Sequence, residues 1–331
     1  MGPLRLRRAE GDYHKRKGTT MKATPHVYVS DRVSRRDFLK LSSLVAGMGG
    51  VMVLSGCGPA AQDATTDEAD AADDAADTAE ATLGDGKTLR VGMEAAYPPY
   101  NWQVQEESEF TIPIDNVDGA FADGYDVQAA KIIAEGLGMD AVAVKLSFDG
   151  LIDALNNGQI DIVCAGMSVT PEREDSASFS DSYIDDDIVM ITKSDSQWAG
   201  AKTFADLADA AIMGQAATMY DDVIEQIVEA EPSVTHLTPA ETVPMVVENL
   251  NSGAADIITY SMLSVPKLLE THPEFVELEM DEKFEGSLMP DNAAIAKGQD
   301  AALEKINEII AGIPEDERQE MWNACMDRQP A

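Results

Sequence analysis

Arg173 is the side chain whose type and position most clearly suit the binding of a small ligand. It follows Thr170 and Pro171, a turn just beyond an apolar segment with the pattern of a buried strand. A guanidinium offers two parallel N–H donors that match the two oxygens of a carboxylate. The alternative is a surface arginine that faces the neighbouring acids Glu172, Glu174 and Asp175. The segment therefore indicates either a carboxylate site or a charged surface.

Metal and cofactor chemistry has no comparable signal in the sequence. His236 and His272 have no Cys or His companion at the spacing of a metal site. Three cysteines in 331 residues cannot form a disulfide framework, and we expect Cys164 and Cys325 to be free thiols. No Gly-x-x-x-x-Gly-Lys-Ser/Thr loop for nucleotide phosphates occurs. The sequence therefore predicts no metal and no cofactor.

The charge balance argues against another class of function. Lys and Arg number 24 against 60 Asp and Glu, which gives a net charge of −36 at pH 7. Binding to nucleic acid requires clustered cations that neutralise phosphates, and this composition lacks them. We therefore expect no nucleic-acid partner.

The length of 331 residues suits about two domains.

Strands and helices alternate from residue 88 onward, and these elements must position Arg173. The apolar spacing predicts strands at 88–93, 141–146 and 160–165, and helices at 124–138 and 151–157. Alternation at this spacing is typical of a parallel sheet built from right-handed crossovers. The sequence therefore predicts the α/β class.

The last helix-to-strand unit occurs twice in the chain. Residues 155–163 and 250–258 share Leu, Asn, Gly, Asp and Ile at matching positions. Either any such turn selects Gly and Asp, or two similar lobes repeat one unit. Ligands of open α/β sheets bind beyond the carboxyl ends of the strands, where the copies lead to residues 166–170 and 260–261. Two lobes that face each other would form a cleft there.

The first 56 residues read as an export signal. Residues 34–40, Ser-Arg-Arg-Asp-Phe-Leu-Lys, resemble the twin-arginine motif, and the apolar stretch after them is too short to span a bilayer. Residues 54–57, Leu-Ser-Gly-Cys, resemble the lipobox of bacterial lipoproteins. We therefore expect a signal peptide over 1–56 and a lipid on Cys57; the alternative is a chance basic and apolar segment. Residues 1–20 are hydrophilic and precede a second methionine, so the sequence leaves both Met1 and Met21 as start sites.

The next segment has the composition of a tether. Residues 60–82 consist mainly of Ala, Asp, Thr and Glu, with almost nothing to bury. We expect residues 57–87 to be a disordered, self-repelling acidic tether that holds a globular domain outside the membrane.

The motifs of the remaining chain together resemble one known family. They are Val91-Gly92-Met93-Glu94, Tyr97-Pro98-Pro99-Tyr100, Gly124-Tyr125-Asp126-Val127, residues 148–152 (Phe-Asp-Gly-Leu-Ile), 158–161 (Gly-Gln-Ile-Asp), 165–173 (Ala-Gly-Met-Ser-Val-Thr-Pro-Glu-Arg) and 179–183 (Phe-Ser-Asp-Ser-Tyr). This set resembles the family 3 solute-binding proteins of ABC transporters, the polar amino acid receptors, over residues 88–325. The sequence departs from the family pattern at Gln128, where an acidic residue is usual, and in a longer insertion between Asn101 and Gly124.

The resemblance implies a fold and a function. The fold is α/β, periplasmic-binding-protein-like type II: two Rossmann-like lobes joined by a two-segment hinge that closes around a small ligand. The first lobe would comprise 88–184 and 293–331, and the second 188–286. The protein would bind an amino acid or a related small carboxylate and deliver it to an ABC permease with a separate ATPase subunit. It would be a monomer, lipid-anchored on the extracytoplasmic face of the cell membrane, and not an enzyme.

The resemblance also assigns roles to residues of the first lobe. Arg173 would hold the carboxylate of the ligand. Ser168 and Gly166 would receive its ammonium through a hydroxyl and a backbone carbonyl. Tyr97 and Phe148 would sandwich its aliphatic part, although each of the two rings could instead serve the core alone.

Three further positions leave alternatives open. Glu94 would read the distal group of a polar ligand, or is a solvated carboxylate at a strand end. Thr218 would offer its backbone N–H to the ligand carboxylate, or is an ordinary helix N-cap. Ser261 stands where the family usually has an aspartate for the α-ammonium, and a buried ammonium without a carboxylate is poorly compensated. The ligand would then be an unusual amino acid, be held by another acid such as Glu94, or lack an α-ammonium.

Two other functions fit the same fold. One is an enzyme like the periplasmic dehydratases that resemble these receptors, for which Glu94 is the candidate acid in the cleft. The other is a ligand sensor without transport.

Overall fold

The computed structural model describes residues 83–330. The expected signal peptide, Cys57 and most of the expected tether lie outside the described residues. Packed structure begins before the expected boundary at residue 88. Leu83 is fully buried, and Asp85 accepts hydrogen bonds from the backbone N–H groups of Lys87 and Thr88. Residues 83–87 therefore belong to the folded part and not to the tether, because Leu83 adds apolar surface to the core.

A parallel sheet forms the centre of the first lobe. β1 (Thr88–Met93) lies between β6 (Asp140–Lys145) and β7 (Ile162–Val163) and runs parallel to both. α2 (Tyr125–Leu137) and α3 (Leu151–Asn156) connect these strands, so the predicted alternation is confirmed here, although β7 is shorter than predicted. α2 ends at Gly138 with φ of 73°, a left-handed conformation that glycine adopts without a side-chain clash.

The polar segment between β1 and α2 forms a small antiparallel sheet. Its strands follow the order β2 (Ala96–Tyr97), β3 (Asn101–Val104), β5 (Phe121–Asp123) and β4 (Ile112–Pro113). Much of the insertion after Asn101 is therefore folded into this sheet. A single bridge between Ile114 and Ala143 joins the segment to β6.

The second lobe repeats the parallel arrangement. β9 (Ala211–Met213) lies between β10 (Thr235–His236) and β11 (Ile257–Ser261) and runs parallel to both. The other elements of this lobe are the short turn η2 (Phe204–Leu207), the edge strand β12 (Phe275–Glu277), and the helices α5 (Met219–Asp222), α6 (Ile224–Ala230), α7 (Val243–Ser252) and α8 (Val265–Thr271).

The repeated Gly and Asp have the same structural role in both lobes. Asp161 accepts a hydrogen bond from the backbone N–H of Arg90 in β1, and Asp256 accepts one from Ala211 in β9, both at 2.9 Å. The turn glycine three residues before each aspartate has a positive φ, 67° in the first copy and 79° in the second. The repeat therefore fastens each strand to its neighbour, and neither aspartate lines the cavity between the lobes.

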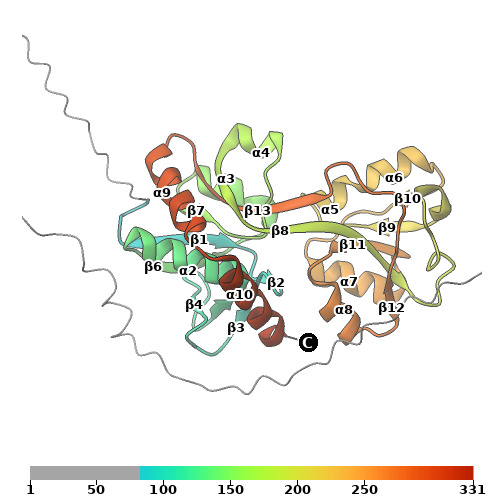
Figure 1. Cartoon of the computed structure of the whole chain (residues 1–331), viewed down its shortest axis with the longest axis horizontal. Coiled ribbons are helices and arrows are strands. Elements are labelled where there is room, and N and C mark those ends of the chain that lie inside the picture. Colours follow the sequence, from blue (N-terminus) through green and yellow to red (C-terminus); the bar gives the residue numbers. More distant parts are fainter. Residues whose placement is uncertain (1–82, 331) are drawn as a thin grey trace, which may run out of the picture. The chain divides into compact units, whose positions relative to one another are not determined.

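Two antiparallel strands connect the lobes. β8 (Ala177–Lys193) and β13 (Leu288–Ala296) pair along most of their shared length. β13 also pairs with β7 of the first lobe and β8 with β11 of the second, so the sheet order is β10-β9-β11-β8-β13-β7-β1-β6 (Figure 1). The predicted parallel sheet is therefore mixed, because the two segments that cross between the lobes run in opposite directions and pair with each other.

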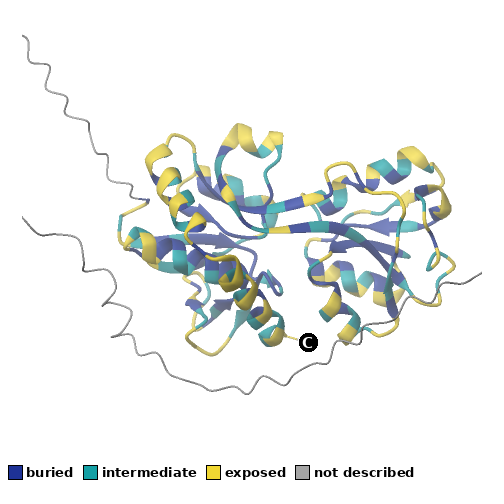
Figure 2. Cartoon of the chain, in the orientation of Figure 1, coloured by how far each residue is buried: buried dark blue, intermediate teal, exposed yellow. Residues whose placement is uncertain are grey.

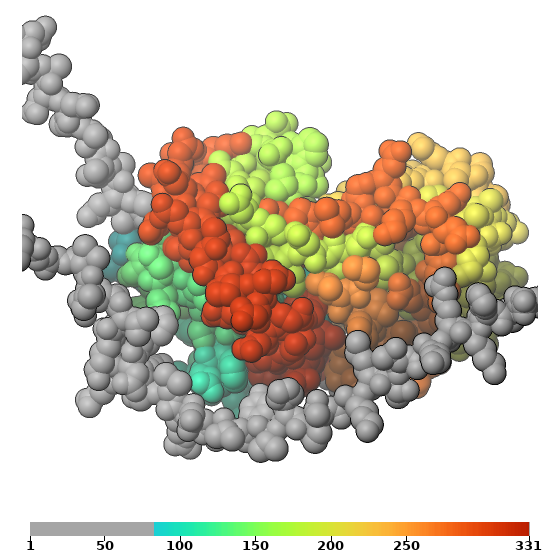
Figure 3. Space-filling view, viewed as in Figure 1, coloured from blue at the N-terminus to red at the C-terminus, as the bar shows by residue number. Residues whose placement is uncertain are grey.

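Three more helices complete the first lobe: α4 (Pro171–Ser176), α9 (Asp300–Ala311) and α10 (Glu315–Arg328). α9 and α10 pack against α2, and Figure 3 shows this carboxy-terminal segment in red across the first lobe. Buried residues follow the strands and the inner sides of the helices (Figure 2). Cys164 and Cys325 are both buried and unpaired, as expected. Within residues 83–330, no helix combines the length and the apolar composition needed to cross a membrane.

Candidate functional site

A cavity lies between the two lobes. Six of the predicted ligand-binding residues line it: Tyr97, Phe148, Gly166, Ser168, Arg173 and Thr218. Gln215, Met219, Tyr220 and Met289 complete the lining. The cavity measures about 330 Å³ including space open to solvent, and the free space inside it is small. That space admits about one water, so an amino acid fits only when the lobes move apart.

Arg173 reaches across the cavity from α4. Its guanidinium donates to the carbonyl oxygen of Ser168 in the first lobe at 2.8 Å and to that of Ala217 in the second at 2.9 Å. It also lies over the ring of Phe148, 5.2 Å from the ring centroid. No acidic residue in the described chain forms an ion pair with it, and burial lowers the pKa of the guanidinium. Arg173 is therefore a half-buried cation that faces both lobes, and not a surface arginine paired with Glu172.

Gly166 and Ser168 follow the carboxyl end of β7, as the motif predicted. Gly166 has φ of 61°, and a Cβ there would lie 3.0 Å from Cε1 of Tyr97. A larger residue would therefore press on the ring of Tyr97 as well as strain the backbone. Ser168 is buried and forms a single β-bridge with Asp291 of β13.

Two tyrosine hydroxyls meet across the cavity. The hydroxyl oxygens of Tyr97 in the first lobe and Tyr220 in the second lie 2.7 Å apart. The ring of Tyr97 stacks on that of Tyr100 with 4.5 Å between centroids. Burial raises the pKa of both Tyr97 and Tyr220 well above the ordinary value, so both hydroxyls stay protonated at neutral pH. This hydrogen bond is a second direct contact between the lobes.

Glu94 and Gln215 form a third contact between the lobes. Nε2 of Gln215 donates to Oε2 of Glu94 at 3.1 Å, and only 6% of Glu94 is exposed. Burial raises the pKa of Glu94 to about 7, against the opposing effects of Gln215 and of the positive charge on Lys145. Glu94 does not itself line the cavity, but it is a buried carboxyl and not a solvated one.

Thr218 occupies the N-cap position of α5, which is only four residues long. Its hydroxyl donates to the carbonyl oxygen of Gln215 at 2.7 Å and makes no capping hydrogen bond to the helix. Thr218 is therefore the N-cap residue that the sequence left open, but its hydroxyl does not cap the helix. The preceding Ala217 has φ of 59°, a left-handed conformation, and its carbonyl accepts the bond from Arg173.

Ser261 is fully buried and does not line the cavity. Its hydroxyl donates to Oδ2 of Asp186 on β8 at 2.5 Å, and the hydroxyl of Tyr100 donates to the same oxygen at 2.6 Å. Oδ1 of Asp186 accepts the backbone N–H groups of Asp187 at 2.7 Å and Leu263 at 3.0 Å. A carboxylate therefore lies beside the position where the family pattern has an aspartate, but it comes from a strand of the hinge.

Four polar residues of this region were not predicted from the sequence: Asp186, Asp291, Gln215 and Tyr220. Asp186 is the middle of three consecutive aspartates, 185–187, in a strand that continues as an apolar run. Three acids at the start of an apolar strand are unusual, and this pattern could have identified Asp186 from the sequence. Gln215 and Tyr220 have no comparable signal, because only the packing of the two lobes brings them to the first lobe.

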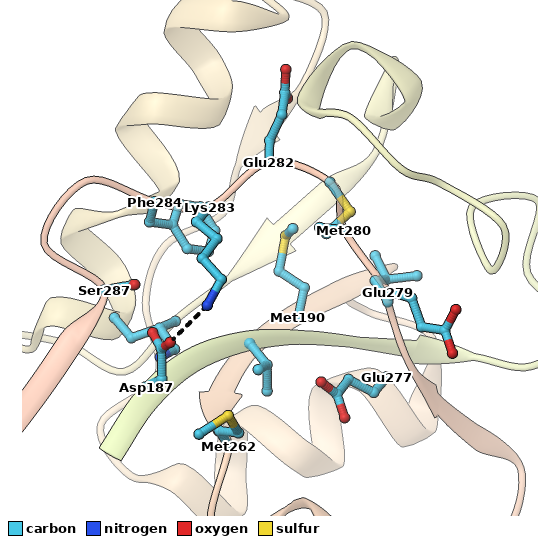
Figure 4. Close-up of a pocket in the computed structure, with 13 residues that line it drawn as sticks. Asp187, Met190, Met262, Glu277, Glu279, Met280, Glu282, Lys283, Phe284 and Ser287 are labelled. Carbon is cyan, nitrogen blue, oxygen red and sulfur yellow. Dashed lines mark hydrogen bonds and ion pairs between the residues drawn. The ribbon is translucent and has the colours of Figure 1, made fainter. Parts of the chain in front are cut away.

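A second pocket opens within the second lobe (Figure 4). Asp187 and Met190 of β8 line it together with the segment 277–287, and Nζ of Lys283 lies 3.4 Å from Oδ2 of Asp187. Asp186 is not among the residues that line this pocket. Asp187 therefore has a cation partner in this pocket.

Comparisons with known proteins agree with the fold and the site. The family model for bacterial extracellular solute-binding proteins, family 3, matches residues 89–323. ABC transporter arginine-binding protein 1 of Escherichia coli K12 is 27% identical over 236 residues, which cover 69% of this chain and 86% of that protein. A crystal structure of the substrate binding protein of an amino acid ABC transporter is 27% identical with a TM-score of 0.62, and the match covers 73% of this chain and 100% of that one. The structure of an ancestral arginine-binding protein bound to arginine is 26% identical with a TM-score of 0.58, over 72% of this chain and 97% of that one.

These matches confirm the predicted architecture, the periplasmic-binding-protein-like fold of amino-acid-binding proteins. The family model alone spans most of the described residues. The chain therefore belongs to family 3 of the bacterial extracellular solute-binding proteins.

Proposed function

We propose that the chain is the substrate-binding component of an amino acid ABC transporter and binds an α-amino acid between its two lobes. The observation that carries this proposal is Arg173, a half-buried guanidinium with only carbonyl partners at the cavity. A ligand carboxylate would replace these neutral acceptors with charge-assisted, paired hydrogen bonds. The protein is a binding protein and not an enzyme, in keeping with its family.

L-arginine is the first ligand to test. Relatives of this chain include proteins named for binding arginine. Glu94 also supports a basic ligand, because a cation near this buried carboxyl would offset the desolvation that raises its pKa. The distal guanidinium of arginine would supply such a cation.

Ligand entry would exchange contacts between the lobes for contacts to the ligand. Three direct contacts now hold the lobes together at the cavity: Arg173 with Ala217, Tyr97 with Tyr220, and Glu94 with Gln215. β8 and β13 are the two segments that would bend as the lobes separate. A permease would then receive the ligand when the lobes open.

The test is a thermal-shift screen of the twenty standard amino acids, followed by calorimetry on those that stabilise the protein. Arg173→Ala should weaken binding of such an amino acid by roughly 2 to 5 kcal/mol, about 30-fold to several thousand-fold. Lys283→Ala is the matched control, because it removes one exposed positive charge that is not part of the cavity lining. A change of less than about threefold in a folded Arg173→Ala variant would be too small for a paired carboxylate contact and would contradict the proposal.

We further propose that the protein is exported by the twin-arginine route and anchored by a lipid on Cys57. Support comes from the motifs at residues 34–40 and 54–57, which lie outside the described residues. Labelling with a radioactive fatty acid should mark the wild type but not Cys57→Ala. The double variant Arg35→Lys with Arg36→Lys should remain in the cytoplasm. Equal label on Cys57→Ala would refute the anchor.

A further inference from the structure

Two aspartates of the connecting strands lie on the cavity side. Asp186 on β8 is directly opposite Met289 on β13, and Asp291 is directly opposite Ile184. Opposite residues of an antiparallel pair share a face of the sheet, as do residues two apart on one strand. Met289 lines the cavity between the lobes, so Asp186 and Asp291 share a sheet face with a lining residue and lie behind the lining rather than in it.

Asp291 is the less satisfied of the two. It forms a β-bridge with Ser168, which lines the cavity and stands at the position assigned to a ligand ammonium. Only 3% of Asp291 is exposed, and its Oδ2 is fully buried without a hydrogen-bond donor among the described residues. A buried carboxylate oxygen without a donor is costly unless a cation or a donor reaches it.

The surroundings of Asp291 supply no compensating charge. Burial raises the pKa of Asp291 well above its usual range, and the charged groups that add to this effect are Asp126, Asp186 and Asp185, all of them acidic. Asp126 is itself buried, where it accepts hydrogen bonds from Tyr183 and Asn101. The local field therefore favours a positive charge beside Asp291.

Asp186 adds a second negative charge held only by neutral donors. These are the hydroxyls of Tyr100 and Ser261 and two backbone N–H groups. Its neighbour Asp187, by contrast, has Lys283 as a partner (Figure 4). Within residues 83–330, no lysine or arginine pairs with Asp186 or with Asp291. Asp187, on the same strand as Asp186, does have such a partner in Lys283.

We propose that Asp291 receives the α-ammonium of the ligand, next to Ser168, with Asp186 as a supporting negative charge. This inference rests on the proposed function. The acid would come from a hinge strand, β13, and not from the end of β11, where Ser261 stands. The ligand would then contact one of the two segments that bend when the lobes close. Such a site selects amino acids over their deaminated acids, because a ligand without an ammonium leaves Asp291 uncompensated.

The test compares two probes in the full chain: L-arginine and 5-guanidinopentanoate, which is arginine without its α-amino group. Should another of the twenty amino acids stabilise the wild type more, that amino acid and its own deaminated acid replace the pair. Calorimetry should show that Asp291→Asn weakens L-arginine binding about tenfold or more. The same variant should bind 5-guanidinopentanoate at least as well as the wild type does.

Asp185→Asn is the matched control, because Asp185 is exposed on the same strand, directly opposite Pro290. It should change the affinity for L-arginine by less than about twofold. A readout of stability separates binding from structure. Asp291→Asn should not lower the free energy of unfolding, because the buried oxygen makes no hydrogen bond to lose and the amide carries no buried charge. If folding needs the carboxylate of Asp291, the variant would instead have a lower free energy of unfolding than the wild type.

Three outcomes would overturn the inference. If a folded Asp291→Asn binds L-arginine as tightly as the wild type, the ammonium lies elsewhere, while the proposed function stands. If Asp291→Asn does not fold, Asp291→Ala takes its place, and failure of both to fold assigns Asp291 a structural role. If the wild type binds none of the twenty amino acids, the proposed function fails and this inference fails with it.

Discussion

The hydroxyl of Ser261 donates its hydrogen bond to Asp186, which lies 75 residues earlier in the chain. Tyr100 of the first lobe donates to the same carboxylate oxygen. One carboxylate on the connecting strand β8 therefore binds a side chain from each lobe. The departure from the family pattern at Ser261 therefore has a structural explanation, because the carboxylate of Asp186 already lies beside this position.

Ser261→Asp should lower the stability of the protein. A second carboxylate would face Asp186 in a buried site and would replace a donor by an acceptor, at a cost of roughly 3 kcal/mol or more. Ser261→Ala only removes the donor and should cost about 1.5 to 3 kcal/mol. Urea unfolding of both variants at pH 7 checks the order. A Ser261→Asp protein as stable as the wild type, with stronger amino acid binding, would show that the site accepts two acids.

Glu94→Gln should stabilise the protein at high pH and not at low pH. The pKa of Glu94 is raised from 4.5 to about 7 in the folded protein, so the native state binds more protons than the unfolded state between these values. Stability therefore falls as the pH rises through this window. Glutamine carries no charge and can still accept the hydrogen bond from Gln215. The free energy of unfolding should rise by roughly 1 to 3 kcal/mol at pH 8 and be unchanged at pH 4. An equal effect at both pH values would mean that Glu94 titrates normally.

Tyr97→Phe and Tyr220→Phe should weaken the contact between the lobes. Either substitution leaves the partner hydroxyl buried without its hydrogen bond, which costs about 1 to 3 kcal/mol. The double variant should cost less than the sum of the two, because it leaves no hydroxyl behind. A double-mutant cycle by urea unfolding measures this coupling, and small-angle scattering should show a larger radius of gyration for the single variants. Strictly additive effects would argue against a direct bond.

His236→Gln should destabilise the protein more at pH 5.5 than at pH 9. Nε2 of His236 lies 2.7 Å from Asp221 and Nδ1 lies 3.0 Å from Glu225. Burial alone would lower its pKa, but the two carboxylates outweigh burial and raise it. This stabilisation is complete below the pKa of the unfolded state and is lost as the pH rises through the raised pKa. Because the site is partly exposed, the difference should stay below about 1 kcal/mol. Thermal unfolding across this pH range is the measurement, and a loss of stability that is larger at pH 9 would contradict it.

Local pattern was enough to predict the elements that carry the first half of the site. The apolar spacing located β1, α2, α3 and β6 to within a residue or two, because side-chain periodicity depends only on near neighbours. The motif after β7 then placed Gly166, Ser168 and Arg173 at the carboxyl end of a buried strand. Their arrival at one cavity follows from the topology of an open α/β sheet.

Contacts across the lobes could not be predicted in this way. The hydroxyls of Tyr97 and Tyr220 come from positions 123 residues apart, and Asp186 meets Ser261 only through the pairing of β8 with β11. The sequence by itself determined which residues end a strand and which face of it they occupy. Only the tertiary structure decided which acid lies beside Ser261 and which one lies behind the cavity lining, because strand register and lobe packing are set by the burial of the whole core and not by any local run of residues.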